Sequence, residues 1–142
     1  MRLLIIGCSQ SKTLQPGLIP ASERYCGSFW KVVHRALRDY PALTKDLEIL
    51  VISAKFGAIT SKHTIPWYEC RMTRERANEL QSQVVATINT RIAQGQYDDV
   101  LICLGANYRL AIVGANLEGA HRTTGGIGMQ GKQLKLWLRQ QT

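Results

Sequence analysis

The chain has 142 residues, of which 45% are hydrophobic and 20% are charged, and these proportions are typical of a folded domain and exclude a disordered segment. This length predicts one domain over residues 1–142. No apolar run approaches the roughly 20 residues that cross a membrane, and the apolar start is too short for a signal peptide. We therefore expect a cytoplasmic protein with no membrane partner. Its 18 Lys and Arg against 10 Asp and Glu give a net charge of +8, which favours a polyanionic partner: DNA, RNA or a nucleotide.

The cysteines and histidines show no metal-binding pattern. Cys8, Cys26, Cys70 and Cys103 form no CxxC pair, and the three histidines lack zinc-finger spacing. Thiols stay reduced by default in the cytoplasm. We therefore expect four free cysteines, no metal and no cofactor, and the oligomeric state stays open.

The first third of the chain predicts a strand, an irregular segment and a helix. The apolar run Leu3–Ile6 indicates a buried strand that ends in a Gly-Cys-Ser loop. Residues 15–27 contain two prolines and predict a long irregular segment. Ser28 is a suitable N-cap for a helix that Pro41 ends. The apolar face expected for this helix consists of Phe29, Val32, Val33, Ala36 and Leu37.

Two further strands and two further helices are expected. The runs Leu47–Ile52 and Val100–Leu104 predict buried strands. Between them, Thr73 can cap a long helix that ends at Gly95. A short helical stretch follows the third strand, and then a glycine-rich turn at 123–128 with no strand clearly leading into it. The last helix is expected to turn four apolar residues inward: Met129, Leu134, Trp137 and Leu138.

This order predicts an α/β fold: a single three-layer domain with a mostly parallel sheet covered by helices on both faces. In such sheets, ligands bind beyond the carboxyl ends of the strands. All three expected strands end in small or polar residues, beginning with Gly7, Ser53 and Gly105. The sequence therefore predicts a site at that edge.

Two of these strand ends combine serine with lysine. After the first strand, Ser9 and nearby amides could form an anion-binding turn, with Lys12 as a point charge for a phosphate. Cys8 is either a nucleophile or a small buried residue that closes the strand. After the second strand, Lys55 could be partly desolvated, which would lower its pKa and permit amine chemistry. It could also grip a phosphate, or be an ordinary solvated lysine.

The segment 65–72 combines aromatic and charged residues. Trp67 and Tyr68 adjoin Glu69 and Arg71, and this mixture suits a nucleobase pocket, since aromatic rings stack on bases and arginine holds phosphates. The alternative is that the aromatics pack the loop on the core. We expect one of the two to do so and Tyr68 to face the site.

Other basic and glycine-rich positions are weaker candidates. Arg74, Arg76 and Lys132 lie on predicted helices and could bind nucleic acid, or belong to solvated faces. Glycines 125, 126 and 128 precede a helix whose amides could bind an anion, or they form a flexible turn.

The order of these motifs resembles a widespread family of uncharacterised bacterial and phage domains. The shared pattern is C-S-x-x-K at Cys8, S-A-K-[YF]-G at Ser53, and a Pro-Tyr block before Met72. It is also distantly similar to the YaaA peroxide-stress proteins. The resemblance implies an α/β domain, DNA binding linked to stress response, and one pocket formed by seven residues: Cys8, Ser9, Lys12, Ser53, Lys55, Tyr68 and Tyr108.

Three functions are compatible with the sequence. The first is a nucleic-acid-associated protein with a base or nucleotide pocket, as in a glycosylase, lyase or transferase. There Lys12 or Lys55 acts on the sugar or phosphate, Glu69 is a general base, and Gly105 and Tyr108 line the pocket. On this hypothesis Lys55→Ala abolishes activity. The second is a DNA-binding module without chemistry. The third is a small-molecule nucleoside or phosphosugar transferase.

Overall fold

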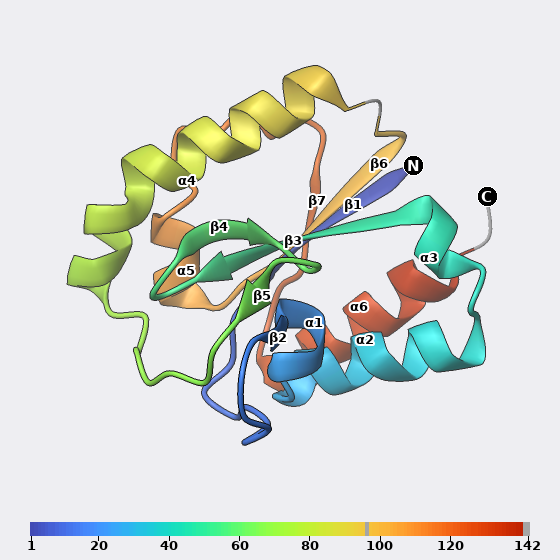
Figure 1. Cartoon of the computed structure of the whole chain (residues 1–142). Helices are drawn as coiled ribbons and strands as arrows, with labels where there is room; N and C mark the ends of the chain where they lie inside the picture. Colours follow the sequence, from blue (N-terminus) through green and yellow to red (C-terminus); the bar gives the residue numbers. More distant parts are fainter. Residues whose placement is uncertain (96, 141–142) are drawn as a thin grey trace.

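The computed structural model describes residues 1–95 and 97–140 (Figure 1). Its main sheet has five strands in the order β4-β3-β1-β6-β7. The parallel strands are β1 (Arg2–Gly7), β3 (Leu47–Ser53), β6 (Asp99–Cys103) and β7 (His121–Arg122). The edge strand β4 (Gly57–Thr60) runs antiparallel to β3. A separate pair joins β2 (Ile19–Pro20) to β5 (Thr64–Ile65).

Helices cover both faces of this sheet, which confirms the predicted α/β fold class. Figure 1 shows α2 (Ser28–Asp39) and α6 (Ile127–Arg139) together on one side, and α4 (Arg74–Gln94) with α5 (Ala106–Leu110) on the other. The short helices are α1 (Ala21–Arg24) and α3 (Leu43–Asp46).

Side chains of each central strand alternate between two buried clusters. Leu4 and Ile6 of β1 pack in the cluster that contains the apolar faces of α2 and α6. Leu3 and Ile5 pack in the other cluster, with residues of α4 and α5. Because both faces of the strand are covered, every position must be apolar, and this explains the uninterrupted apolar run in the sequence.

The order of the strands creates a switch point at β1. The chain passes from β1 to β3 on one side of it and later returns to place β6 on its other side. The loops that follow β1 and β6 therefore leave in different directions, and a crevice forms between their carboxyl ends.

The prediction of an irregular segment over 15–27 was wrong in part, because this segment contains β2 and α1. Arg24 explains why this segment has a regular structure. It is completely buried, and its guanidinium donates hydrogen bonds of 2.7–3.1 Å to the carbonyl oxygens of Thr13, Gln15, Gly17 and Ile65. One buried arginine thus ties the loop to β5.

Other differences from the predicted elements are local. The sequence did not predict β4, which pairs with β3 after a tight turn where Gly57 has φ +73°. It also did not predict β7, which leads into the glycine turn. Met129 was expected in the core but is 58% exposed, whereas Leu134, Trp137 and Leu138 are buried as expected. None of the described helices is both long and apolar enough to span a bilayer.

Candidate functional site

A cavity of about 410 Å³ lies at the switch point, beyond the carboxyl ends of β1 and β6. Its size falls within the range of small-molecule sites. The loop after β1, the end of β6 with the start of α5, and the first turns of α2 and α6 all contribute to it. The lining residues are Gly7, Cys8, Ser9, Gln10, Ser11, Gly27, Ser28, Phe29, Trp30, Cys103, Gly105, Tyr108, Ile127 and Gln130. We call this the switch-point cavity.

Close packing of Ser9 against Gly27 fixes the loop after β1. A Cβ atom at Gly27 would lie 2.6 Å from the Cβ of Ser9, so only glycine allows this approach. The Gly27 amide donates to Ser9 Oγ at 3.1 Å, and that hydroxyl donates to the Ser11 carbonyl at 2.6 Å. Ser9 therefore holds the cavity rim in shape.

The first turns of α2 and α6 border the cavity. Ser28 was expected to be the N-cap of α2, but it is already helical, and the N-cap is Gly27, where an added side chain would clash with Ser9. Among the described residues, no side chain caps α2 or α6. Ser28, Phe29 and Ile127 line the cavity, so the starts of two helices, where amides lack intrahelical partners and carry partial positive charge, border it.

Tyr108 positions Cys8, which lines the cavity. Its hydroxyl lies 3.1 Å from Cys8 Sγ and donates to the Cys8 carbonyl at 3.2 Å. Burial raises the pKa of Tyr108, so the phenol stays neutral. The ring packs on Gly7, where a Cβ atom would lie 3.1 Å from it. The Ala54 amide lies 3.5 Å from Cys8 Sγ as a further donor. The thiol is therefore held in place in a half-buried residue that lines the cavity.

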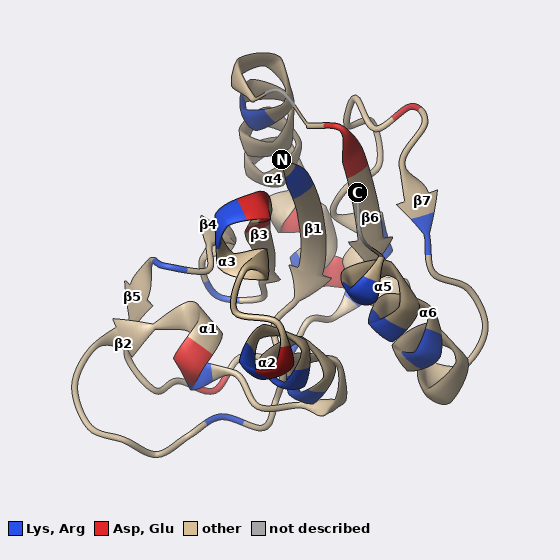
Figure 2. Ribbon diagram, turned by 90° about the vertical axis from the view of Figure 1, so that its right-hand side faces the viewer, with Lys and Arg blue, Asp and Glu red and all other residues tan. Residues whose placement is uncertain are grey.

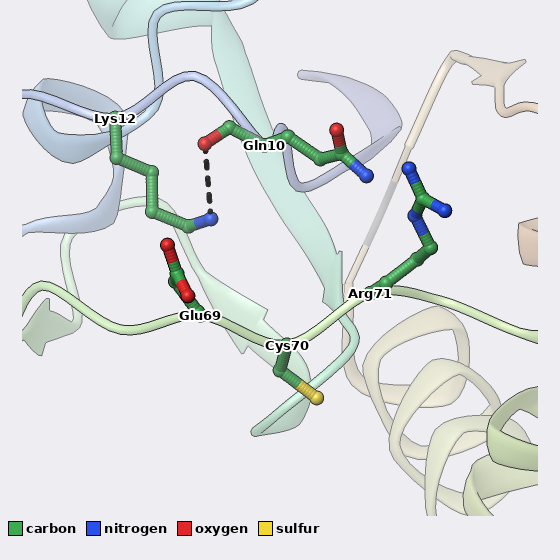
Figure 3. Close-up of a pocket in the computed structure, with 5 residues that line it drawn as sticks. All are labelled: Gln10, Lys12, Glu69, Cys70 and Arg71. Atoms are coloured by element: carbon green, nitrogen blue, oxygen red, sulfur yellow. Dashed lines mark hydrogen bonds between the residues drawn. The ribbon is translucent and has the colours of Figure 1, made fainter.

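A second, more polar cavity of about 270 Å³ adjoins the first (Figure 3). Its lining residues are Gln10, Lys12, Glu69, Cys70 and Arg71. Gln10 lines both cavities, so the loop after β1 contacts each of them. With its amide oxygen toward Arg71, Gln10 accepts hydrogen bonds from Nε at 2.7 Å and Nη2 at 3.0 Å.

Lys12 is the amine best placed for chemistry. Burial lowers its pKa below the ordinary value, and nearby Cys8 and Glu69 oppose this shift. Figure 3 shows the Glu69 carboxylate on the same side as the Lys12 ammonium, which donates to the Gln10 carbonyl at 3.4 Å. The pair can bind a phosphate or sugar through Lys12 and accept a proton through the exposed Glu69.

The two candidate lysines lie near one tyrosine. Lys12 Nζ is 4.6 Å and Lys55 Nζ is 5.6 Å from the centre of the Tyr68 ring. Tyr68 itself is only 4% exposed, whereas Trp67 is 44% exposed. One aromatic residue is thus in the core as expected, but the prediction that Tyr68 faces the site was wrong, because its hydroxyl bonds to Tyr25 inside the protein.

Ser53 and Lys55 differ from their expected roles. Ser53 is completely buried and lines neither cavity. Its hydroxyl bonds to Tyr68 at 3.0 Å and accepts from the amides of Lys55 and Phe56 at 3.2 and 3.1 Å. Burial also raises the pKa of Tyr25, in the same network, to about 12. The Lys55 side chain is exposed, so the desolvation expected for it is absent.

The three residues predicted to bind nucleic acid do not form one surface. Arg76 donates to the carbonyl oxygens of Ala54 at 2.6 Å and Lys55 at 3.0 Å, and so fastens α4 to the loop after β3. Arg74 begins α4 and Lys132 lies on α6, and these helices cover opposite faces of the sheet. Both side chains are exposed.

Several cavity residues were not identified from the sequence. Trp30 is buried below the rim, and its Nε1 donates to the Gly7 carbonyl at 2.9 Å. Phe29 is half-buried and Ile127 is 67% exposed at the α6 end. The available signal was the glycine immediately before each helix, since an uncapped helix start offers its amides to a ligand.

All four cysteines are free thiols, and burial raises the pKa of Cys103 to about 11. In residues 1–95 and 97–140, no three His, Cys, Asp or Glu side chains are grouped as a metal site requires.

A search of curated proteins finds no match to the chain. A protein-family model matches residues 3–140 and so covers nearly the whole sequence. The chain therefore belongs to DUF6884, a family of unknown function.

Proposed function

We propose that this protein acts on nucleic acids and holds one base or nucleotide in the switch-point cavity. The observation that carries this proposal is the cavity itself, which joins half-buried Phe29 to the amide-rich starts of α2 and α6. A ring system fits against the apolar wall, and a phosphate fits at the helix amides.

The adjoining polar cavity supplies the candidate chemistry. Lys12 lies on the loop between the two cavities, and its lowered pKa favours a reactive amine. Glu69 is the candidate general base, and Arg71 a candidate phosphate ligand. The proposal includes the assignment to DNA and the role in stress response that the YaaA-like motifs of the sequence imply. On this proposal the protein is a base-processing enzyme.

The experiment is calorimetric titration of free nucleosides and nucleoside 5′-monophosphates into the protein and two Gly105 variants. Gly105 has an extended backbone (φ −72°, ψ 172°), and only Tyr108, at 3.7 Å, lies within 4 Å of an added Cβ atom. Gly105→Ala therefore adds a methyl group without a clash and serves as the control. Gly105→Leu extends a side chain into the cavity.

We expect the wild type and Gly105→Ala to bind one nucleotide class, and Gly105→Leu to bind it at least about tenfold more weakly, a loss of about 1.4 kcal/mol. Equal binding by all three proteins would show that the ligand does not bind in this cavity. Tight binding of mononucleotides combined with indifference to DNA and RNA would instead favour a small-molecule transferase.

A further inference from the structure

A second feature of α2 and α6 lies outside both cavities. These helices pack against each other, and a groove of about 110 Å³ runs between them. Four basic residues and one valine line this groove: Lys31, Val32, Arg35, Lys135 and Arg139. We call it the α2–α6 groove. These basic residues belong to two helices that are far apart in the chain, and the fold brings them together.

Positive charge in this region is only weakly compensated. Together the two helices carry six Lys and Arg residues but one acidic residue, Asp39. Figure 2 shows this imbalance as blue basic bands on α6 and α2, with a red acidic band on α2. Asp39 lies 3.2 Å from Arg139 and 3.6 Å from Arg38. Its negative charge therefore compensates the groove only at the end where Arg139 lies.

The three remaining basic residues of the groove face solvent. Lys31, Arg35 and Lys135 are exposed, and within the described part of the chain none of them forms an ion pair. Three like charges along one groove repel one another, so they do not stabilise the fold. A chain of phosphates, which carries one charge per nucleotide, would compensate all three at once.

The groove begins next to the switch-point cavity. Ser28 lines the cavity, and Lys31 lies three residues further along the same helix, a rise of about 4.5 Å. On α6, Gln130 lines the cavity and Lys135 follows five residues later, about 7.5 Å along the axis. A strand with one base in the cavity could therefore continue along the groove.

We propose that the α2–α6 groove binds the phosphate backbone of a nucleic acid beside the nucleotide that enters the cavity. This inference rests on the proposed function and specifies that its substrate is a nucleic-acid polymer. It assigns nucleic-acid binding to Lys31, Arg35 and Lys135, and not to α4.

The test is fluorescence anisotropy with labelled single-stranded DNA, single-stranded RNA and duplex DNA across a salt series. The groove variant is Lys31→Glu/Arg35→Glu/Lys135→Glu. The control, Lys45→Glu/Lys62→Glu/Arg74→Glu, changes three other exposed basic residues and alters the net charge equally. Thermal melting verifies that both are folded. Lys31→Gln/Arg35→Gln/Lys135→Gln replaces the first variant if the added carboxylates prevent folding.

We expect the groove variant to bind at least about tenfold more weakly than the control, and the slope of log Kd against log salt to fall by roughly two to three, one for each lost phosphate contact. Equal losses in both variants would show only a net-charge effect and would overturn the proposal. Binding of the wild type to anionic phosphatidylserine vesicles, but to none of the nucleic acids, would also overturn it.

Calorimetry with free nucleotides separates this inference from the proposed function. The groove variant should keep the wild-type affinity for a free nucleotide, because the cavity is unchanged. Groove-dependent polymer binding without any nucleotide binding would refute the cavity proposal and support the groove. Nucleotide binding without polymer binding would refute the groove, leave the cavity as a nucleotide site, and favour the small-molecule transferase.

Discussion

The loops after β1 and β3 have similar sequences, a serine followed by a lysine, but the structure uses them differently. The β1 loop contacts both cavities, and its Ser9 and Lys12 lie at their edges. In the β3 loop, Ser53 is completely buried and the Lys55 side chain is exposed. The difference arises because β1 lies at the switch point, whereas β3 continues directly into the antiparallel strand β4.

This contrast shows that the position of a strand in the sheet decides what its end can do. The β3 loop is closed by hydrogen bonds to the Ser53 hydroxyl and by Arg76. The β1 loop leaves the sheet where its neighbours diverge, and so it stays open to a ligand. Each of the following predictions separates a structural role from a binding role in these regions.

The largest effect is expected for Arg24, which holds the segment after the β1 loop. Arg24→Ala removes a completely buried guanidinium and leaves four carbonyl oxygens, one of them buried, without their donor. We expect a loss of about 3–5 kcal/mol in the free energy of unfolding, measured by urea denaturation. The exposed Arg38→Ala should change it by less than about 0.5 kcal/mol. Similar small losses for both variants would show that Arg24 does not anchor this segment.

Ser53→Ala tests the structural role of the β3 loop. Removal of the buried hydroxyl should cost about 1–3 kcal/mol of unfolding free energy, because Tyr68 and two amides lose their partner. Its nucleotide affinity should stay at the wild-type level in calorimetry. Ser9→Ala should show the opposite pattern, with a smaller loss of stability and a weaker affinity. A folded Ser53→Ala protein with impaired binding would contradict this division.

Lys12 is expected to titrate below the ordinary lysine pKa of 10.5, because burial disfavours its charged form. The cost of burying that charge is present at neutral pH and is relieved as the pH rises through the lowered pKa toward 10.5. Acetylation with trace acetic anhydride across a pH series, read by mass spectrometry, measures the midpoint. In the urea-unfolded protein the midpoint should return to about 10.5. A folded-state midpoint at or above that value would contradict the prediction.

The sequence predicted the fold class well because uninterrupted apolar residues in a strand, and apolar residues at helical spacing, directly indicate which faces are buried. The long helix after Thr73 is one example, since the threonine hydroxyl accepts from the Arg76 amide and Gly95 ends the helix as expected. The short strands β2, β5 and β7 were not predicted, because two residues carry no periodic pattern.

The candidate site was predicted only in part, for a physical reason. Cys8, Ser9, Gly105 and Tyr108 follow strands, and position in the chain was enough to place them. Phe29 and Gln130 enter the same cavity from helices on one face of the sheet, and only tertiary packing brings them there. The burial of these side chains could not be predicted either, since Ser53 and Ser9 both precede a lysine at the end of a predicted strand.

The central claim is that the switch-point cavity binds a nucleobase or nucleotide. The most direct measurement is an NMR titration of the 15N-labelled protein with nucleosides and nucleoside monophosphates, which reports on each backbone amide. We predict that the amide shifts of Ser9, Ser28, Gly105 and Ile127 move together and saturate with one nucleotide class. No shift at any concentration, or shifts confined to residues outside this cavity, would contradict the claim.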